Sequence, residues 1–277
     1  MGRRLGGELL RLRDASGKTQ QQAAVTINAT QSKIVKMERG WVPMRDPDIH
    51  MLCEFYGAAD RKTVAKLSEL AGLDRERRKA QGWWRHVAAG EFAEYIAMED
   101  AATRVRNWQL SLVPGLLQIP AYTRSLAVNT GPWETPDFVE HAVDVKRQRQ
   151  KRLYGERPLT WFGVVWEAAL RQQVGGPSTM RAQLDHLLDV GELPNVTIQV
   201  LPFRAGAHPC VTGAFSVLSF AEAGSLDVVQ SDTVTGMGWV EDIETGARYG
   251  DHFDRTARMS LSARESLELI NSLRKEA

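Results

Sequence analysis

The sequence contains little cysteine. Only two of its 277 residues are cysteines, Cys53 and Cys210, and they lie far apart. Two such residues provide neither a disulfide framework nor the ligand spacing of a zinc site. Cys53 stands in an apolar segment (IHMLCEFY), so we expect it to be buried packing. The sequence therefore argues against a disulfide-stapled secreted domain and against a zinc protein, and we expect no cofactor and no metal.

Long apolar runs are also missing. No segment reaches the ~20 consecutive apolar residues that a membrane-spanning helix needs. The first residues (MGRRLGGELLRLRD) lack the apolar core of a secretory signal. The apolar fraction of 43% and the charged fraction of 25% are ordinary for a globular protein. We therefore expect a cytoplasmic protein with no membrane partner.

Recognisable catalytic motifs are absent as well. The sequence has no HExxH, no phosphate-binding loop, no GxSxG and no Rossmann glycine pattern. One crowded set of carboxylates has no histidine at ligand spacing, so we expect a solvated helix face rather than a metal site. This set comprises Glu91, Glu94, Glu99 and Asp100. We expect that the protein is not an enzyme.

Two weaker patterns also have simple interpretations. The glycines at 175–176 precede a helical segment, and we expect them to start that helix rather than to hold an anion. The sequence from His208 to Cys210 places a thiol near an imidazole, but no third catalytic partner is in view. We expect a loop there.

What the sequence does contain is a helix-turn-helix pattern over residues 19–40 (TQQQAAVTINATQSKIVKMERG). Thr19 suits the N-cap of a first helix, over about 20–27. Asn28 suits a turn with left-handed backbone angles. Thr30 caps a second helix that runs to about 39, and Gly40 ends it. The alternative is a generic helical hairpin in a bundle.

The second helix has the composition of a recognition helix. Ile34 and Met37 are three residues apart and face the core, so the polar side chains point away from it. A glutamine amide can pair with adenine, and a lysine can reach guanine or a phosphate. We expect Gln20, which opens the first helix, to bond a phosphate through its side chain or its backbone N–H. The predicted DNA contacts are Gln20, Thr30, Gln31, Ser32, Lys33 and Lys36.

The remaining N-terminal segments complete an all-α domain. A helix over residues 3–15 carries an apolar stripe. Arg13 on this helix is predicted to pair with Glu38, at the inner edge of the recognition helix. Helices over 48–56 and 61–70 complete a five-helix DNA-binding bundle spanning 1–72. The charged run 73–82 is expected to be a linker or a solvated helical extension.

Charge is unevenly distributed along the chain. Residues 1–82 hold 16 Lys and Arg against 10 Asp and Glu, while the remainder holds 19 against 24. The basic part carries the helix-turn-helix, as a phosphate-binding module should. Because the excess is modest, we expect tight binding to need two copies per site, and hence a homodimer.

Residues 83–277 are predicted to form an α+β regulatory and dimerisation domain. Strands are expected at 161–166, 196–203, 214–220 and 226–231, with another near Trp239. Helices are expected at 91–108, 138–154, 167–174, 178–190 and 262–275, and the basic run VKRQRQKRL is expected to be a solvated helix face. Seven of the eight tryptophans lie in this domain. They either line a ligand pocket or form the core.

Residues 3–72 resemble the DNA-binding domain of the lambda-repressor-like (xenobiotic-response-element) regulators. Their pattern is TQxxLAxxxGVSQSxISxxExG, from which this chain departs at Ala23, Asn28 and Val35. In that family the residues that open the recognition helix read bases, which implies the same role for residues 31–33 here. Val35 places an apolar side chain near the DNA groove. Because of this departure, we expect the operator to differ from those of relatives.

The rest of the chain resembles the uncharacterised C-terminal domain of actinobacterial regulators of the WhiJ-like developmental type. The segments that carry this resemblance are VPGLLQIPAYTR (113–124), RQRQ (147–150), WEAALRQQVGGPSTMRAQLDHLL (166–188), PNVTIQVLPFRAGAH (194–208), GAFSVLSF (213–220) and SARESLELI (262–270). The chain departs at 228–244, where relatives have a shorter VVYVE. The resemblance implies no enzymatic activity, and it implies a small partner protein in an antitoxin–toxin-like arrangement.

These observations predict a sequence-specific transcriptional regulator, a repressor, that binds double-stranded DNA as a homodimer. Its C-terminal domain is expected to bind a small partner protein or an effector. Two alternatives remain open: an antitoxin-like protein whose main role is to sequester its small partner, and a regulator that senses a small ligand.

Overall fold

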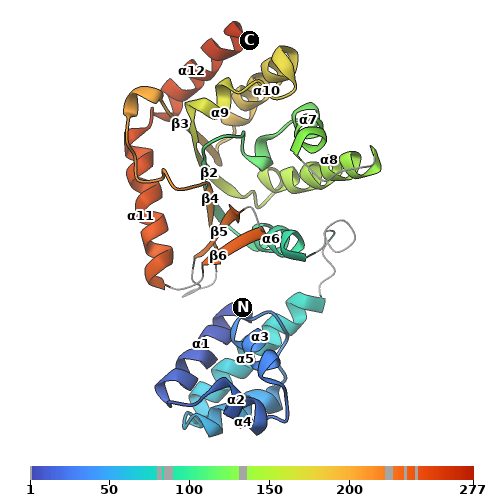
Figure 1. Ribbon diagram of the computed structural model, residues 1–277, viewed down its shortest axis with the longest axis vertical. Coiled ribbons are helices and arrows are strands. Elements are labelled where there is room, and N and C mark those ends of the chain that lie inside the picture. Colours follow the sequence, from blue (N-terminus) through green and yellow to red (C-terminus); the bar gives the residue numbers. More distant parts are fainter. Residues whose placement is uncertain are drawn as a thin grey trace. The chain divides into compact units, whose positions relative to one another are not determined.

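The computed structural model divides the chain into two compact units, residues 1–82 and 83–277. The structure describes residues 2–79, 83, 90–130, 136–221, 227–233, 236–240 and 243–277. The first unit is helical, and the second combines a six-stranded sheet with helices (Figure 1). The predicted fold class, a five-helix bundle followed by an α+β domain, is confirmed.

The first unit contains the five expected helices. They are α1 (Gly2–Ala15), α2 (Gln20–Thr26), α3 (Gln31–Glu38), α4 (Asp46–Phe55) and α5 (Arg61–Lys79). Helix α4 begins two residues earlier than predicted, with a proline in its first turn, where the missing N–H costs nothing. The core of the first unit joins Leu5 and Leu9 of α1 to Ile34 and Met37 of α3, and it includes Cys53, which was predicted to be buried.

Helix α5 runs nine residues past its predicted end at residue 70. The predicted linker at 73–82 is therefore helical as far as residue 79. Arg75 explains the difference, because its guanidinium donates to the carbonyl oxygen of Met44 at 2.6 Å and to the Asp46 carboxylate at 3.0 Å. These bonds join the extended helix to the start of α4.

The sheet of the second unit has the order β3-β2-β1-β4-β5-β6. Strands β1, β2 and β3 are parallel, and β4, β5 and β6 continue the sheet in antiparallel pairs. The strands are β1 (Arg104–Gln109), β2 (Thr160–Trp166), β3 (Val196–Leu201), β4 (Phe215–Ser219), β5 (Val228–Thr233) and β6 (Gly236–Val240). All five strands that the sequence predicts are present.

Strand β1, near the middle of the sheet, was not predicted. The sequence predicts one helix over 91–108, but α6 (Gly90–Ala101) ends before the strand begins. Val105 and Trp108 are three residues apart, a spacing that also fits one helix face. In the strand they point to opposite sides, because side chains alternate, and they enter different cores.

Most helices of the second unit cover one face of the sheet, and α11 covers the other (Figure 1). The larger core lies beneath α6, α7 (Pro120–Thr130), α9 (Glu167–Arg171), α10 (Gly176–Gly191) and α12 (Ala263–Glu276), with α8 (Pro136–Gln150) packed beside α7. Helix α11 (Ile243–Met259), which the sequence did not predict, packs Phe253 against the opposite face. Short 3₁₀ turns stand at η2 (Gly115–Leu117), η3 (Lys151–Leu153) and η4 (Phe203–Ala205).

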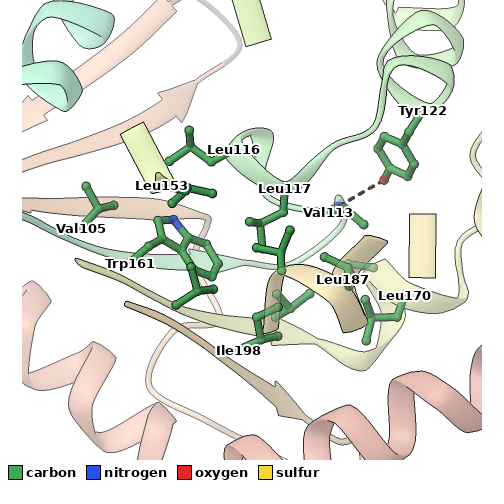
Figure 2. Close-up of a cluster of buried hydrophobic side chains, with 14 of the residues drawn as sticks. Val105, Val113, Leu116, Leu117, Tyr122, Leu153, Trp161, Leu170, Leu187 and Ile198 are labelled. Carbon is green, nitrogen blue, oxygen red and sulfur yellow. Dashed lines mark hydrogen bonds between the residues drawn. The ribbon is translucent and has the colours of Figure 1, made fainter. Parts of the chain in front are cut away.

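The larger core fixes the loop that follows β1. Figure 2 shows Trp161 packed among aliphatic side chains, and Tyr122 directed at the backbone of Val113. The Tyr122 hydroxyl accepts a hydrogen bond from that N–H at 3.1 Å. The buried Gln183 amide bonds the same loop at two points, accepting from the N–H of Ile119 at 2.8 Å and donating to the carbonyl of Leu117 at 2.7 Å. This loop is therefore held to both the core and α10.

Among the described residues, no helix combines the length and the apolar character that crossing a bilayer requires.

Candidate nucleic-acid interface

The turn between α2 and α3 has the predicted local chemistry. Thr19 forms a reciprocal capping box with Gln22, its hydroxyl accepting from the Gln22 N–H at 3.2 Å. Asn28 has a φ of 50°, the left-handed angle that the turn needs. The Thr30 hydroxyl accepts from the N–H of Lys33 at 3.2 Å and caps α3. Short-range hydrogen bonds thus define the beginning of both helices.

Helix α3 buries one side and exposes the other. Ile34 and Met37 are each 1% exposed and lie in the core. Gln31, Ser32 and Lys36 are exposed, as is Thr30 before them. These four residues form what we call the recognition surface. The exposure of Gln31, Ser32 and Lys36 agrees with the sequence pattern, while the Thr30 hydroxyl caps α3. The DNA contacts of all four residues stay predictions.

Lys33 does not project with these residues. Its ammonium donates to the Asp48 carboxylate at 3.0 Å, and Arg45 donates to the same carboxylate at 3.1 Å. Asp48 is only 5% exposed, so the pair lies partly buried between α3 and α4. The prediction that the Lys33 side chain points away from the fold is therefore wrong for this state. Its contact with DNA stays a prediction, and it requires Lys33 to leave Asp48 to Arg45.

The predicted pair of Arg13 and Glu38 is present. The two carboxylate oxygens of Glu38 accept from Arg13 at 2.5 and 3.3 Å. This bonding raises the pKa of Arg13. The pair links α1 to α3 and anchors the inner edge of the recognition helix.

Gln20 joins the same network. Its side-chain amide donates to Glu38 at 2.8 Å, so that amide serves the interior of the bundle rather than a phosphate. The prediction of a phosphate bond from the Gln20 side chain is therefore wrong for this state. Its backbone N–H at the start of α2 is the remaining candidate.

One feature near α3 was missed in the sequence. The guanidinium of Arg39 lies over the ring of Trp41, 4.8 Å from its centroid. Both side chains are exposed, and Trp41 is 47% accessible. A cation stacked on a tryptophan holds its position better than a free arginine. The signal was an arginine and a tryptophan flanking the glycine that ends the helix.

In the second unit, the sequence segments that carry the C-terminal resemblance bond to one another. Gln183 of the segment 166–188 bonds to the loop in 113–124, and Gln150 donates to the carbonyl oxygen of Gln118 at 2.8 Å. The Ser266 hydroxyl accepts from the Val200 N–H at 2.8 Å, joining α12 to β3. The segments thus form one connected scaffold.

Comparison with known families agrees with this division. The model of a domain of unknown function, DUF5753, matches residues 92–272. The chain belongs to this family. The model of a helix-turn-helix domain matches residues 4–67. Searches among curated proteins and among solved structures found no match. The matches confirm a helix-turn-helix DNA-binding domain ahead of an uncharacterised domain, while the closer relation to WhiJ-like regulators stays a prediction.

The thiol in the DUF5753 domain is packed inside. Cys210 is 2% exposed; its sulfur donates to the carbonyl oxygen of His252 at 3.4 Å and accepts from the Thr256 hydroxyl at 3.1 Å. Burial raises the pKa of this thiol, which disfavours the nucleophilic thiolate. The ring of His208 stacks edge-on against Trp108 at 5.1 Å. The geometry gives both residues a packing role.

The carboxylates of α6 do not all lie on the solvated helix face that the sequence predicts. Glu99 is 1% exposed and accepts two hydrogen bonds from Arg149 of α8, at 2.7 and 2.8 Å. The solvated-face predictions are therefore wrong for Glu99 and for Arg149, since the two elements pack together. The side chain of Glu91 lies outside the described part. Within that part, no group of three His, Cys, Asp or Glu residues is arranged to hold a metal.

The glycines at 175–176 start a helix as predicted. Gly175 has a φ of 74° and caps α10, with Pro177 in the first turn. The left-handed angle explains the glycine there.

Proposed function

We propose that this DUF5753 protein is a cytoplasmic, sequence-specific transcriptional regulator, a repressor, that binds double-stranded DNA as a homodimer. The observation that supports it best is the recognition surface, whose polar side chains stand exposed while Ile34 and Met37 hold the helix in the core. A recognition helix needs this separation of faces.

Each residue of the surface, and Lys33 beside it, has a role in this proposal. Thr30 caps α3 and contacts DNA where the helix begins. Gln31 pairs with adenine through its amide, and Ser32 bonds a neighbouring base edge. Lys36, a turn further along α3, binds a phosphate. Lys33 binds guanine or a phosphate after leaving Asp48, whose charge Arg45 continues to neutralise.

The DUF5753 domain has the regulatory role in this proposal. It supplies dimerisation and binds an effector or a small partner protein, and it carries out no reaction. Two recognition helices on one face of DNA must lie ~34 Å apart to enter successive major grooves. Two weak modules joined in this way bind far more tightly than one.

Gel-shift titration on a selected operator tests the contacts. Gln31→Ala and Lys33→Ala should each weaken binding by about 1–3 kcal/mol if they read bases. Gln148→Ala and Lys151→Ala are matched controls on exposed positions of the DUF5753 domain, and they should bind as the parent does. Circular dichroism checks that each variant is folded. Unchanged binding by both Gln31→Ala and Lys33→Ala would remove these residues from the contact list.

A further inference from the structure

The DUF5753 domain contains a partly open cavity of about 240 Å³. Its floor is the sheet face formed by β1, β4 and β5, and its roof is α6 and α8. The loop after β1, which Tyr122 and Gln183 hold in place, forms a wall. Three apolar side chains that line it, Val105, Leu116 and Trp161, are visible in Figure 2. Its volume falls just below the ~300 Å³ at which pockets for drug-sized ligands begin, so a small metabolite fits it.

An unsatisfied acceptor lies in the floor of this cavity. Asn107 is 6% exposed, and its side-chain nitrogen donates to the Ser216 hydroxyl at 2.8 Å. Its side-chain oxygen, Oδ1, is buried without a hydrogen-bond partner in the described structure. Nearly all buried polar atoms have a partner, because leaving one unpaired is costly. The atom therefore fits a hydrogen-bond donor supplied from the cavity.

An uncompensated cation lies in the roof. The Lys146 ammonium donates to the side-chain oxygen of Gln118, and the described residues place no carboxylate within ion-pair distance of it. Burial, helped by the charge of Arg149, lowers the pKa of Lys146 to about 7. A partly buried ammonium without a counter-ion is unfavourable, and an anion beside it removes that penalty.

Arg149 is the second cation of the roof, and it is already held in place. Glu99 accepts from its Nε and Nη2 atoms, and its guanidinium lies 5.1 Å from the ring of Tyr95. Its Nη1 atom, close to Gly115, donates to no group in the described chain. One guanidinium hydrogen-bonding edge therefore stays available in a rigid setting.

We propose that this cavity is the effector site and that it binds a small organic acid carrying a hydroxyl or amino group. The carboxylate lies against Lys146 and Nη1 of Arg149, the donor group bonds Oδ1 of Asn107, and a short apolar body packs on Val105 and Trp161. The roof is formed by α6 and α8, so occupancy acts on the contacts between these two helices. Control of DNA binding by this ligand rests on the function proposed above.

Ligand binding is measured on the full chain without DNA. The probes are lactate, valine, phenyllactate and 4-hydroxybenzoate, each compared with its own primary amide. Thermal unfolding and ligand-observed NMR at pH 6.5 report binding. At least one acid should raise the unfolding midpoint more than its amide does, since the amide lacks the charge that Lys146 recognises. The proposal is overturned if no acid exceeds its amide, or if sodium phosphate produces the same shift as the best acid.

Two variants locate the site. Lys146→Met should weaken binding of the best acid at least tenfold, and methionine suits the buried position. Asn107→Leu should weaken it as well, by removing the acceptor. Lys151→Met, at an exposed position beyond α8, is the matched control and should bind normally. If the best acid still raises the unfolding midpoint of Lys146→Met as it does that of the parent, the cavity is not the binding site. This conclusion holds even if Asn107→Leu does not fold.

The pH dependence gives a second signature. Lys146 faces Arg149 of its own helix, Glu99 and Tyr95 of α6, and Asp232 of β5 around the same cavity. An anion requires the protonated lysine, so affinity should stay level below pH 7 and then fall by up to tenfold per pH unit. The fall ends at the higher pKa that Lys146 has in the complex. Affinity of an acid that is constant from pH 6 to 9 contradicts the role of Lys146.

Gel shifts with and without the best acid then test regulation. A change in operator affinity of at least threefold supports coupling, and no change contradicts an effector role while the binding result stands. Loss of the proposed DNA-binding function is a separate outcome, seen when no operator is bound even without the acid.

Discussion

At the scale of single residues, the burial of an ion pair decides how much it contributes to stability. Arg13 and Glu38 share a pair in which both side chains are nearly covered, whereas Arg11 and Glu8 of α1 form an exposed pair at 3.0 Å. Exposed pairs contribute little, because water and salt screen them. Breaking a buried pair leaves one charge uncompensated inside the protein.

We expect Arg13→Met to destabilise the first unit by about 3–5 kcal/mol, since among the described residues Glu38 would keep Gln20 alone as a hydrogen-bond partner. The matched control Arg11→Met should cost below about 1 kcal/mol. Hydrogen exchange of amides in α1 and α3, measured on the full chain, reports this unit by itself. Equal losses in both variants would contradict a structural role for the buried pair.

Predictability at this scale did not follow distance along the chain: Arg13 and Glu38 are 25 residues apart and were predicted, whereas Lys33 and Asp48 are 15 apart and were not. The pair of Arg13 and Glu38 was predictable because both positions sit at defined points of a known helix pattern. For Lys33, Gln20 and Arg149 no such pattern specifies which residue of the neighbouring element faces them. Periodicity along one helix identifies a face, and it does not say which neighbouring element covers that face.

At the scale of elements, local capping chemistry predicts boundaries well, and tertiary packing changes the rest. The beginnings of α2, α3 and α12 follow from Thr19, Thr30 and Ser262, whose hydroxyls accept backbone N–H groups. Strand β1 was not predicted because the spacing of its two large apolar residues also fits one face of a helix. Helix α11 was not predicted because no element was assigned to most of its segment, although its apolar face covers one side of the sheet.

The crossing of α1 over α3 depends on one glycine. A methyl carbon at Gly6 would lie 2.5 Å from the carbonyl oxygen of Met37 and closer still to that of Glu38, whereas one at Gly7 meets nothing within 4 Å. Gly6→Ala should therefore destabilise the first unit by about 1–3 kcal/mol through overpacking. Gly7→Ala should stabilise it by up to about 1 kcal/mol, because alanine favours helix.

Thermal unfolding and hydrogen exchange of the two glycine variants provide the comparison. Weaker operator binding by Gly6→Ala is also expected, since the clash displaces the end of α3. If Gly6→Ala is as stable as Gly7→Ala, α1 and α3 do not approach each other as the structure shows.

At the scale of the whole molecule, the chain joins a basic helical unit to an acidic DUF5753 unit, each with its own core. The sequence predicts this division because composition changes near residue 83. It predicts a pocket or a tryptophan core as alternatives, and the structure contains both a core around Trp161 and a cavity beside it. The polar atoms of that cavity come from α6, β1, the loop before α7, α8, β4 and β5, and no single sequence motif predicts such a combination.

The proposed function requires two copies of α3 to read DNA together. Selection from a random duplex pool by the full chain, followed by sequencing, measures this property. We expect an inverted repeat whose half-site centres lie ~34 Å apart, or about 10 base pairs. We also expect that Gln31→Ala loses this enrichment while Gln148→Ala retains it. Two results would contradict reading by α3. One is that no sequence is enriched from the pool, and the other is that the double variant Gln31→Ala/Ser32→Ala enriches the same sequence as the parent chain.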